Sequence, residues 1–337
     1  MRLRGAMAAL LAGAALLSGC RKGHPERDAI ALDVRAEWVG RTKASLLSTS
    51  TLEGVEIAAS ACVFEGEWSD ALPPNFFHHV PFRYDGSLWV SEDQYFWPGS
   101  GHNLRFFCYA PYLAASLSGG SRAGAPELQF SVAPDARDQV DLLVADSGTV
   151  DGARRLSQPI SFSHALCAVR FAIKAGSRSG KLSGLQIGGL YNSASRSLAA
   201  GSAWTSFYGD ASYTLEGSFP YTCSAEGLDL FDGDQGVFLL LPQTRSTAWI
   251  RAQYQLHGQQ DVLTVSTGDF SIAWEPGRFY TYTLDIREQV YVTVSVAGLA
   301  EVGPDAVFDV GVFPFEPAGP GEGDLTGGNG GYVVTRE

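Results

Sequence analysis

A strict two-residue alternation runs through the stretch Val290-Tyr291-Val292-Thr293-Val294-Ser295-Val296, in which every second side chain is valine. Successive side chains of a β-strand point to opposite faces of a sheet, so this stretch predicts a strand with one apolar face. The same alternation occurs at the start, in the middle and near the end of the chain, in residues 30–35, 169–173 and 308–312. Turn dipeptides of the Asp-Gly and Pro-Gly type punctuate the chain between such runs. The pattern therefore predicts an all-β protein.

The size of the chain fits two folded domains. It has 337 residues, of which 45% are hydrophobic and 12% aromatic, so each of two domains can bury its own core. We expect two antiparallel β-sandwiches, because open sheets would leave one apolar face in water. The formal net charge is −12, and no run of Lys or Arg exceeds two residues. This argues against nucleic acid as a partner, because a phosphate-binding surface needs clustered cations.

Residues 1–20 predict a lipoprotein signal peptide. Arg2 and Arg4 precede the apolar run Ala6–Leu17, which is too short to span a bilayer stably. The run ends in Leu17-Ser18-Gly19-Cys20, which looks like a lipobox, where the Cys20 thiol carries a diacylglycerol and an acyl chain such as palmitate is added. A lipid anchor at Cys20 would tether the chain to the outer face of a bacterial membrane. The alternative is an ordinary secretory signal with a chance cysteine.

Pattern and composition divide the rest of the chain into four segments. We expect a leader over residues 21–41, a first sandwich over 42–153, a second over 154–316 and a flexible Gly/Pro-rich tail over 317–337. The boundary between the sandwiches is placed where residues 147–155 interrupt the strand pattern.

Four cysteines remain within the predicted fold, and no pair has the C-x-x-C spacing of a metal or redox motif. An exported chain can form disulfides, and four cysteines permit two bridges. Each also lies beside apolar residues, which fits buried thiols equally well. The sequence leaves both alternatives open for Cys62, Cys108, Cys167 and Cys223.

No catalytic, cofactor or metal motif is found, so the sequence predicts neither an enzyme nor a bound cofactor. The six histidines lie in no zinc-protease spacing. Adjacent strand residues point to opposite faces, which disfavours a metal held by His78 and His79. The acidic run Asp229–Asp234 lacks the later glutamate and the length of a calcium loop, so we interpret it as a solvated turn.

Four groups of residues, in order along the chain, resemble the fimbrillin family and together extend over about residues 42–287. They are Tyr95-Phe96-Trp97-Pro98 with Leu104–Pro111, Asp141–Ala145 with Ile160–Leu166, Phe238–Gln243, and Trp274–Leu284. The resemblance implies a subunit or accessory protein of a type V fimbria of Gram-negative bacteria. It also implies two transthyretin-like β-sandwich domains in tandem and export to the outer membrane as a lipoprotein.

For a shaft subunit, the resemblance implies that an arginine-specific protease removes the N-terminal strand together with the lipid. A C-terminal strand of the neighbouring subunit then fills the exposed groove, an exchange in which main-chain hydrogen bonds give affinity and alternate side chains set the register. Ile30, Leu32 and Val34 are the candidate removable strand. Arg41 is the candidate processing site, and Arg35 is the runner-up, which would cut close behind Val34.

Two segments are candidates for the donated strand. Their apolar positions are Val290, Val292, Val294 and Val296 in one segment, and Phe308, Val310 and Val312 in the other. The alternatives are that Arg35 and Arg41 are ordinary surface arginines and that residues 290–296 are a core strand. The Gly/Pro-rich tail is not part of the shaft pattern, so shaft, tip and anchor roles stay open.

A second hypothesis is a surface lipoprotein or tip adhesin that binds a glycan or a host protein. Exposed aromatic rings stack on sugars and anchor protein contacts, and Trp204, Phe207 and Tyr208 are the candidates. The same residues fit a core equally well. A third hypothesis, an exported hydrolase, would require a pair of carboxylates that converge in a cleft.

Overall fold

The computed structural model describes the chain in segments, and the account below concerns these residues only. They are residues 29–36, 47, 49–154, 156–175, 179–221, 224–229, 237–286, 290–298, 312–314 and 316–317. Strands dominate them, and the helices within these segments are two short turns, α1 (Thr49–Leu52) and η1 (Ala136–Asp138). The prediction of an all-β chain is confirmed. Neither helix in this part of the chain has the length and apolar character needed to cross a membrane.

The N-terminal half forms a sheet that closes on itself, which we call the N-terminal ring. Its strands are β1 (Leu32–Ala36), β2 (Ile57–Phe64), β3 (Phe77–Tyr84), β4 (Trp89–Ser91), β5 (Asn103–Ala110), β8 (Leu143–Asp146), β9 (Val150–Asp151) and β10 (Gln158–His164). The order is β2-β3-β4-β1-β10-β8-β5-β9, and β5 also pairs back with β2, which closes the ring. Strand β10 follows residue 153, where the sequence placed the boundary between the sandwiches, and yet it belongs to this sheet.

Both faces of β2 and β5 are buried. Phe106 and Cys108 of β5 pack with the apolar residues of the ring interior, while Phe107 and Tyr109 pack with residues of the C-terminal half. A strand that is covered on both faces reads as a continuous apolar run, which explains the sequence Phe106-Phe107-Cys108-Tyr109-Ala110. The two strands therefore separate two adjoining cores.

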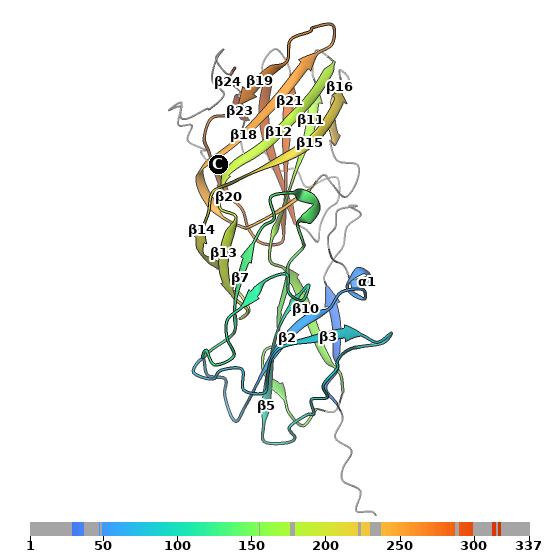
Figure 1. Ribbon diagram of the computed structural model, residues 1–337, viewed down its shortest axis with the longest axis vertical. Helices are drawn as coiled ribbons and strands as arrows, with labels where there is room; N and C mark the ends of the chain where they lie inside the picture. The colour runs from blue at the N-terminus through green and yellow to red at the C-terminus, as the bar shows by residue number, and fades with distance from the viewer. Residues whose placement is uncertain are drawn as a thin grey trace, which may run out of the picture.

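The C-terminal half contains two further sheets. The first has the order β16-β11-β21-β22-β23 with β17 beside β11, and the second has β15-β12-β18-β19-β24 with β20 beside β18. Their strands are β11 (Cys167–Ala175), β12 (Gly180–Leu190), β15 (Ala211–Tyr221), β16 (Ser224–Asp229), β17 (Phe238–Leu240), β18 (Thr244–Leu256), β19 (Leu263–Ser266), β20 (Phe270–Ala273), β21 (Arg278–Ile286), β22 (Val290–Gly298), β23 (Val312–Pro314) and β24 (Glu316–Pro317). The ring and these sheets occupy opposite ends of an elongated molecule (Figure 1).

A small sheet joins the two halves. It has the order β14 (Trp204–Tyr208), β13 (Ser193–Ser197), β7 (Glu127–Ser131) and β6 (Ser116–Leu117). Strand β7 comes from the N-terminal half, and it pairs with β13 from Ser131↔Ser193 to Glu127↔Ser197. The halves are therefore connected by main-chain hydrogen bonds as well as by a shared apolar core.

Three cysteines are buried free thiols. Cys62, Cys108 and Cys167 form no disulfide, so for these three the structure selects one of the two alternatives that the sequence left open. Burial raises the pKa of the Cys62 thiol to about 11, which leaves almost no reactive thiolate at neutral pH. Cys20 and Cys223 lie outside the described residues.

The N-terminal strand as candidate functional site

Strand β1 is the link that the beginning of the chain contributes to the N-terminal ring. It lies between β10 and β4, and Figure 1 shows it in blue beside β10. Its pairing with β10 is parallel and runs from Leu32↔Gln158 to Ala36↔Phe162. Because every other strand of the ring comes from residues after 56, the ring is complete only while this N-terminal segment stays in place.

The two sides of β1 are held unequally. On the β10 side the pairing covers the whole strand, and the Gln158 N–H donates to the Ala31 carbonyl oxygen at 2.8 Å. On the other side β1 pairs with β4 at a single position, Leu32↔Trp89. The Ile30 N–H adds one bond to the Tyr95 carbonyl oxygen at 2.7 Å. Most of the main-chain attachment of β1 is therefore to β10.

The side chains of β1, and that of Ile30 just before it, divide sharply between the interior of the ring and solvent. Ile30, Leu32 and Val34 are 3%, 0% and 2% exposed, and Ala36 is also buried. Arg35 points outward with its side chain 72% exposed, and it forms an ion pair with Asp33 at 3.5 Å. The alternation places the three predicted apolar residues in the ring interior, and the structure adds Ala36 as a fourth.

Burial of these residues makes β1 a major part of the ring core. Each fully buried Ile, Leu or Val side chain contributes roughly 1.5–3 kcal/mol relative to an exposed one. The side chains lie in one cluster with large rings of the other strands, among them Phe82, Trp89 and Phe106. Removal of β1 would therefore expose an apolar groove and the main-chain groups of β10, the two features that an added strand needs.

The chain is fixed again shortly after β1. The Leu47 N–H donates to Oδ2 of Asp141 at 2.8 Å, and the side chain of Asp141 is 1% exposed. The same carboxylate bonds Nδ1 of His164, at the end of β10, at 2.9 Å. His164 thus has a structural contact within the fold. Arg41 belongs to residues 37–46, outside the described part of the chain, between the fixed points Ala36 and Leu47.

The described residues show no metal-ligating cluster of three or more His, Cys, Asp or Glu side chains. The expectation that His78 and His79 point to opposite faces is wrong, because β3 bulges opposite Ser60 and His79 adopts a φ of 54°. The ring centroids are only 6.3 Å apart. Each ring has a protein partner, since His78 Nδ1 lies 3.3 Å from Ser60 Oγ and His79 Nε2 lies 2.7 Å from Tyr109 Oη.

Comparison with known families identifies the chain. The model of the family described as fimbrillin-like matches residues 48–298. The chain belongs to the fimbrillin-like family. Among curated proteins, none matches this chain.

Two solved structures with a similar fold come from Bacteroides species. A fimbrial protein from Bacteroides vulgatus superposes with a TM-score of 0.63 at 18% identity, over 80% of this chain and 99% of that one. A candidate cell adhesion protein from Bacteroides ovatus has a TM-score of 0.50 at 14% identity, over 80% of this chain and 96% of that one. At these identities the likeness shows the fold that the fimbrillin-like chain shares with them.

The predicted donor segments of the fimbrillin-like chain have different places in the fold. Val290, Val292, Val294 and Val296 lie on β22, which pairs with β21 from Ile286↔Val290 to Arg278↔Gly298. Val312 begins β23, a three-residue strand that pairs with the other side of β22, and β24 pairs with β19 of the second sheet. Residues 312–317 thus pair with strands of both C-terminal sheets. Phe308 and Val310 lie outside the described residues.

The aromatic residues of the adhesin hypothesis do not form an exposed group in the fimbrillin-like fold. Trp204 is only 7% exposed, and its Nε1 donates to the Ala165 carbonyl oxygen at 2.8 Å. Of the two alternatives that the sequence left open for Trp204, an exposed ring or a core residue, the structure therefore selects the core residue. Phe207 is half-buried and packs on Tyr191 with ring centroids 5.5 Å apart, while Tyr208 is 54% exposed. Tyr208 is thus the one exposed ring of the predicted three.

Proposed function

We propose that this chain is a structural or accessory subunit of a type V fimbria that assembles by donor-strand exchange after proteolytic removal of β1. The observation that carries the proposal is the position of β1. Together with Ile30 just before it, the strand supplies four inward side chains to the ring, yet it comes from the N-terminal end of the chain, so one cut before Leu47 separates it from every other strand. The vacated place beside β10 would receive a strand of a neighbouring subunit.

Export as an outer-membrane lipoprotein belongs to the same proposal. Cys20 would carry the lipid, and the protein would reach the cell surface as a precursor that still contains β1. The names of the Bacteroides proteins, fimbrial and candidate cell adhesion, support a surface location for this family member. We further propose that the two halves correspond to two tandem transthyretin-like domains, and that the chain has no enzymatic activity and needs no cofactor.

The donated strand is proposed to come from the C-terminal region. Strand β22 is an interior strand of its sheet, so its release would break pairing with β21 along its whole length. Strands β23 and β24 are short and each pairs with one strand, so residues from 312 onward would be released at a lower cost. This makes the segment around Phe308–Val312 and its continuation the better donor of the two.

Arg41 is proposed as the processing site because a cut after Arg35 would fall inside a strand that is paired with β10. We expect Arg41→Ala to block trimming and to leave β1 attached. Treatment of the purified precursor with an arginine-specific protease, followed by N-terminal sequencing and SDS electrophoresis, measures both trimming and polymer ladders. The parent chain is expected to begin at Thr42 and to form ladders, while the variant does neither.

Two further arms make this test decisive. Arg35→Ala is the matched control and is expected to be trimmed and to polymerise like the parent. A chain truncated after Gly311 is expected to be trimmed normally but to form no ladder, because the proposed donor is absent. Trimming of Arg41→Ala at an unchanged rate would contradict the processing site. A trimmed parent that stays monomeric would contradict the shaft role and leave a tip or anchor role.

A further inference from the structure

The outer face of the second C-terminal sheet carries partly exposed polar and aromatic side chains. Strands β12, β15 and β18 lie side by side in this sheet, in the upper half of Figure 1. Along β18 the side chains of Ala248, Ile250 and Ala252 are buried in the core, whereas those that alternate with them, Trp249 and Arg251, are partly exposed. Because the period of a strand is two, Trp249 and Arg251 point outward from the sheet.

A polar row crosses this face from one strand to the next. Its members are cross-strand partners on β15, β12, β18 and β19, in the order Thr214, Gln186, Arg251 and Ser266. Strands lie about 4.8 Å apart, so the row extends over roughly 14 Å. Gln186 Nε2 donates to Thr214 Oγ1 at 3.0 Å, which leaves Gln186 Oε1 available as an acceptor. The row thus offers hydroxyl, amide and guanidinium groups along one line.

Arg251 is a cation without an acidic partner. It makes no ion pair and no hydrogen bond within the described residues, and of its nitrogen atoms only Nε is both buried and unpaired. The two Nη atoms therefore face solvent. The described acids nearest along the chain, Asp261 and Asp269, lie in the segments that flank β19, and neither pairs with Arg251. The Nη edge of the guanidinium is free to donate two parallel hydrogen bonds to a carboxylate.

Trp249 fixes the position of Arg251. The guanidinium carbon lies 5.1 Å from the centroid of the indole ring, where a cation is attracted to the ring electrons. The ring itself rests on Gly188, its cross-strand partner on β12, because a Cβ at Gly188 would lie only 2.6 and 2.8 Å from its Cε2 and Cη2 atoms. A guanidinium that is positioned before a ligand arrives loses less conformational entropy on binding.

The charges on this face select an anion. The chain has a formal net charge of −12, yet the two described charged side chains that lack an ionic partner here, Lys181 and Arg251, are both cations. Lys181 is exposed and is paired with Gln255, four positions along β18 from Arg251, so the two cations are attached roughly 13 Å apart in the strand direction. An extended ligand with more than one negative charge can contact both.

The groups around the cations favour a sugar over a protein. Protein contacts take most of their affinity from apolar side chains that fill dry pockets. This face offers instead a flat row of hydroxyl and amide groups, which both donate to and accept from ligand hydroxyls. The ligand that fits is therefore rich in hydroxyl groups and carries carboxylates.

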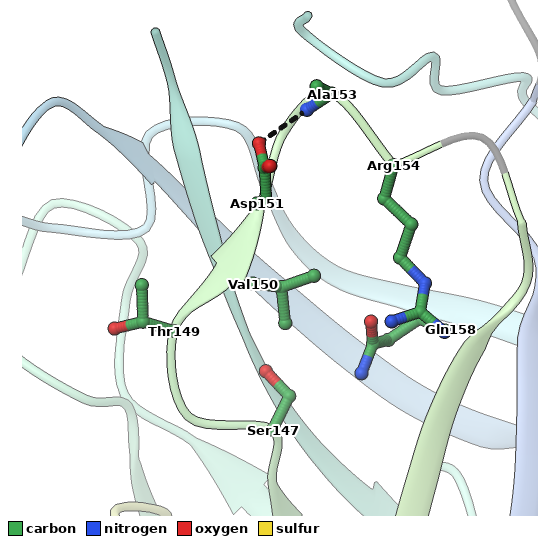
Figure 2. A pocket seen from close by; sticks show the side chains of 7 residues that line it. All are labelled: Ser147, Thr149, Val150, Asp151, Ala153, Arg154 and Gln158. Atoms are coloured by element: carbon green, nitrogen blue, oxygen red, sulfur yellow. Dashed lines mark hydrogen bonds between the residues drawn. The ribbon is translucent and has the colours of Figure 1, made fainter. Parts of the chain in front are cut away.

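The hollow beside β9 of the N-terminal ring is a poorer place for such a ligand. Figure 2 shows the side chain of Arg154 extending toward Gln158, while Oδ1 of Asp151 accepts from the Ala153 N–H at 2.8 Å. The polar groups of that hollow are thus directed at the protein itself.

We propose that the outer face of the second C-terminal sheet binds an acidic polysaccharide. Arg251 holds the carboxylate of a hexuronic acid unit, and hydroxyl groups of the same and neighbouring sugars lie along the row from Thr214 to Ser266. Lys181 attracts a second carboxylate of the same chain. The proposal goes beyond fimbrial assembly and does not depend on strand exchange, because β12 and β18 belong to the half of the molecule that does not contain β1.

The test is calorimetric titration of the purified full chain with oligogalacturonate and with oligomannuronate. The salt concentration is about 0.15 M, at which charges more than about 8 Å apart are largely screened, so that the remaining acids of the chain have little effect. At least one of the two is expected to bind. Its methyl ester, which keeps the sugars and removes the charge, is expected to bind at least about tenfold more weakly. Poly-glutamate, which has carboxylates but no sugar, is expected to bind more weakly as well.

Variants locate the binding. Arg251→Met is expected to weaken it at least about tenfold, because charge-assisted hydrogen bonds are lost. Arg251→Lys keeps the charge but not the parallel bonds, and its affinity should be intermediate. Lys181→Met should have a smaller effect. Arg83→Met removes an exposed arginine of β3, which pairs with Glu56, and is the matched control that should bind like the parent.

The unfolding temperature of each variant is measured alongside and should match that of the parent, so that lost binding reports on this face. Absence of binding by both oligosaccharides overturns the proposal. It is also overturned if Arg251→Met binds as tightly as the parent, or if the methyl ester binds as tightly as the acid. Poly-glutamate that binds as tightly as the oligosaccharides would show that the face recognises acidic polypeptides instead.

Discussion

Separation of β1 from the ring is expected to lower the unfolding temperature by about 10 °C or more. Three large side chains lose their burial, at roughly 1.5–3 kcal/mol each, which gives about 5 kcal/mol or more. For a unit of this size each kcal/mol corresponds to about 2–4 °C. The change is made by placing a site for a sequence-specific protease within residues 37–46, cutting, and removing the released peptide in mild denaturant. Calorimetry before and after the cut measures the result.

A synthetic peptide with the sequence of residues 29–36 is expected to restore the lost stability. The same peptide with Leu32→Asp should fail, because it would bring an unpaired charge into the ring interior. A peptide with Asp33→Asn is the matched control and should succeed, because Asp33 points away from the buried cluster. These two variants separate strand insertion from non-specific binding of an apolar peptide.

The position of the cut needs its own control. The same protease site placed in the loop at Gly119–Gly124 leaves β1 covalently attached, and we expect a cut there to cost much less stability. An unchanged unfolding temperature after loss of β1 would mean that the ring does not depend on the strand. Donor-strand exchange would then have no driving force in this chain.

Local patterns in the sequence predicted the strand that matters most. Ile30, Leu32 and Val34 alternate with Ala31, Asp33 and Arg35, and the structure buries all three apolar side chains because the period of a strand is two. The closure of the ring could not be predicted in the same way. It depends on the pairing of β2 with β5 and of β1 with β10, which join residues far apart in the chain. A local sequence pattern does not predict which distant strand will be the pairing partner.

The sequence also could not predict where the alternation of side chains breaks down. The bulge at His79 reverses the expected direction of neighbouring side chains, and its non-glycine residue at positive φ gives no sequence signal. Trp204 lies on a strand whose next two residues are exposed, but its ring turns inward to the Ala165 carbonyl oxygen. Burial there depends on the sheet that joins the halves, and that sheet pairs β7 with β13, from Ser131↔Ser193 to Glu127↔Ser197, far apart in the chain.

A buried ion pair at the junction of the halves is the second place where a large effect is expected. Arg105 of β5 and Asp146 of β8 pair through two hydrogen bonds, and their side chains are 17% and 1% exposed. Arg105 also lies over the rings of Trp68 and Phe107, at 4.8 and 5.1 Å from their centroids. Oδ2 of Asp146 accepts from the Ala200 N–H at 2.9 Å, so one carboxylate ties the ring to a loop of the C-terminal half.

We expect Asp146→Asn to cost about 3–5 kcal/mol of unfolding free energy, because it leaves the Arg105 charge buried and uncompensated. The double variant Arg105→Met/Asp146→Asn removes that charge. Its loss of unfolding free energy is expected to be smaller than the sum of the losses of Arg105→Met and Asp146→Asn. Asp135→Asn, which breaks the exposed pair with Arg137, is the control and should change little. Denaturant titration of the four variants measures the coupling. Additive losses would mean that the pair is not coupled.

The same carboxylate predicts how stability depends on pH. Burial alone would raise the pKa of Asp146, but hydrogen bonds from Arg105, Ala200 and Gly148 outweigh it and hold the pKa below its ordinary value of 3.8. A pKa that is lower in the folded state adds stability above the unfolded value, and this contribution is lost as pH falls through the folded-state pKa. The parent should therefore lose stability below about pH 4 more steeply than Asp146→Asn, which lacks the titrating group. Parallel acid titrations of the two chains measure this difference, and identical profiles would show that Asp146 does not hold the halves together through its charge.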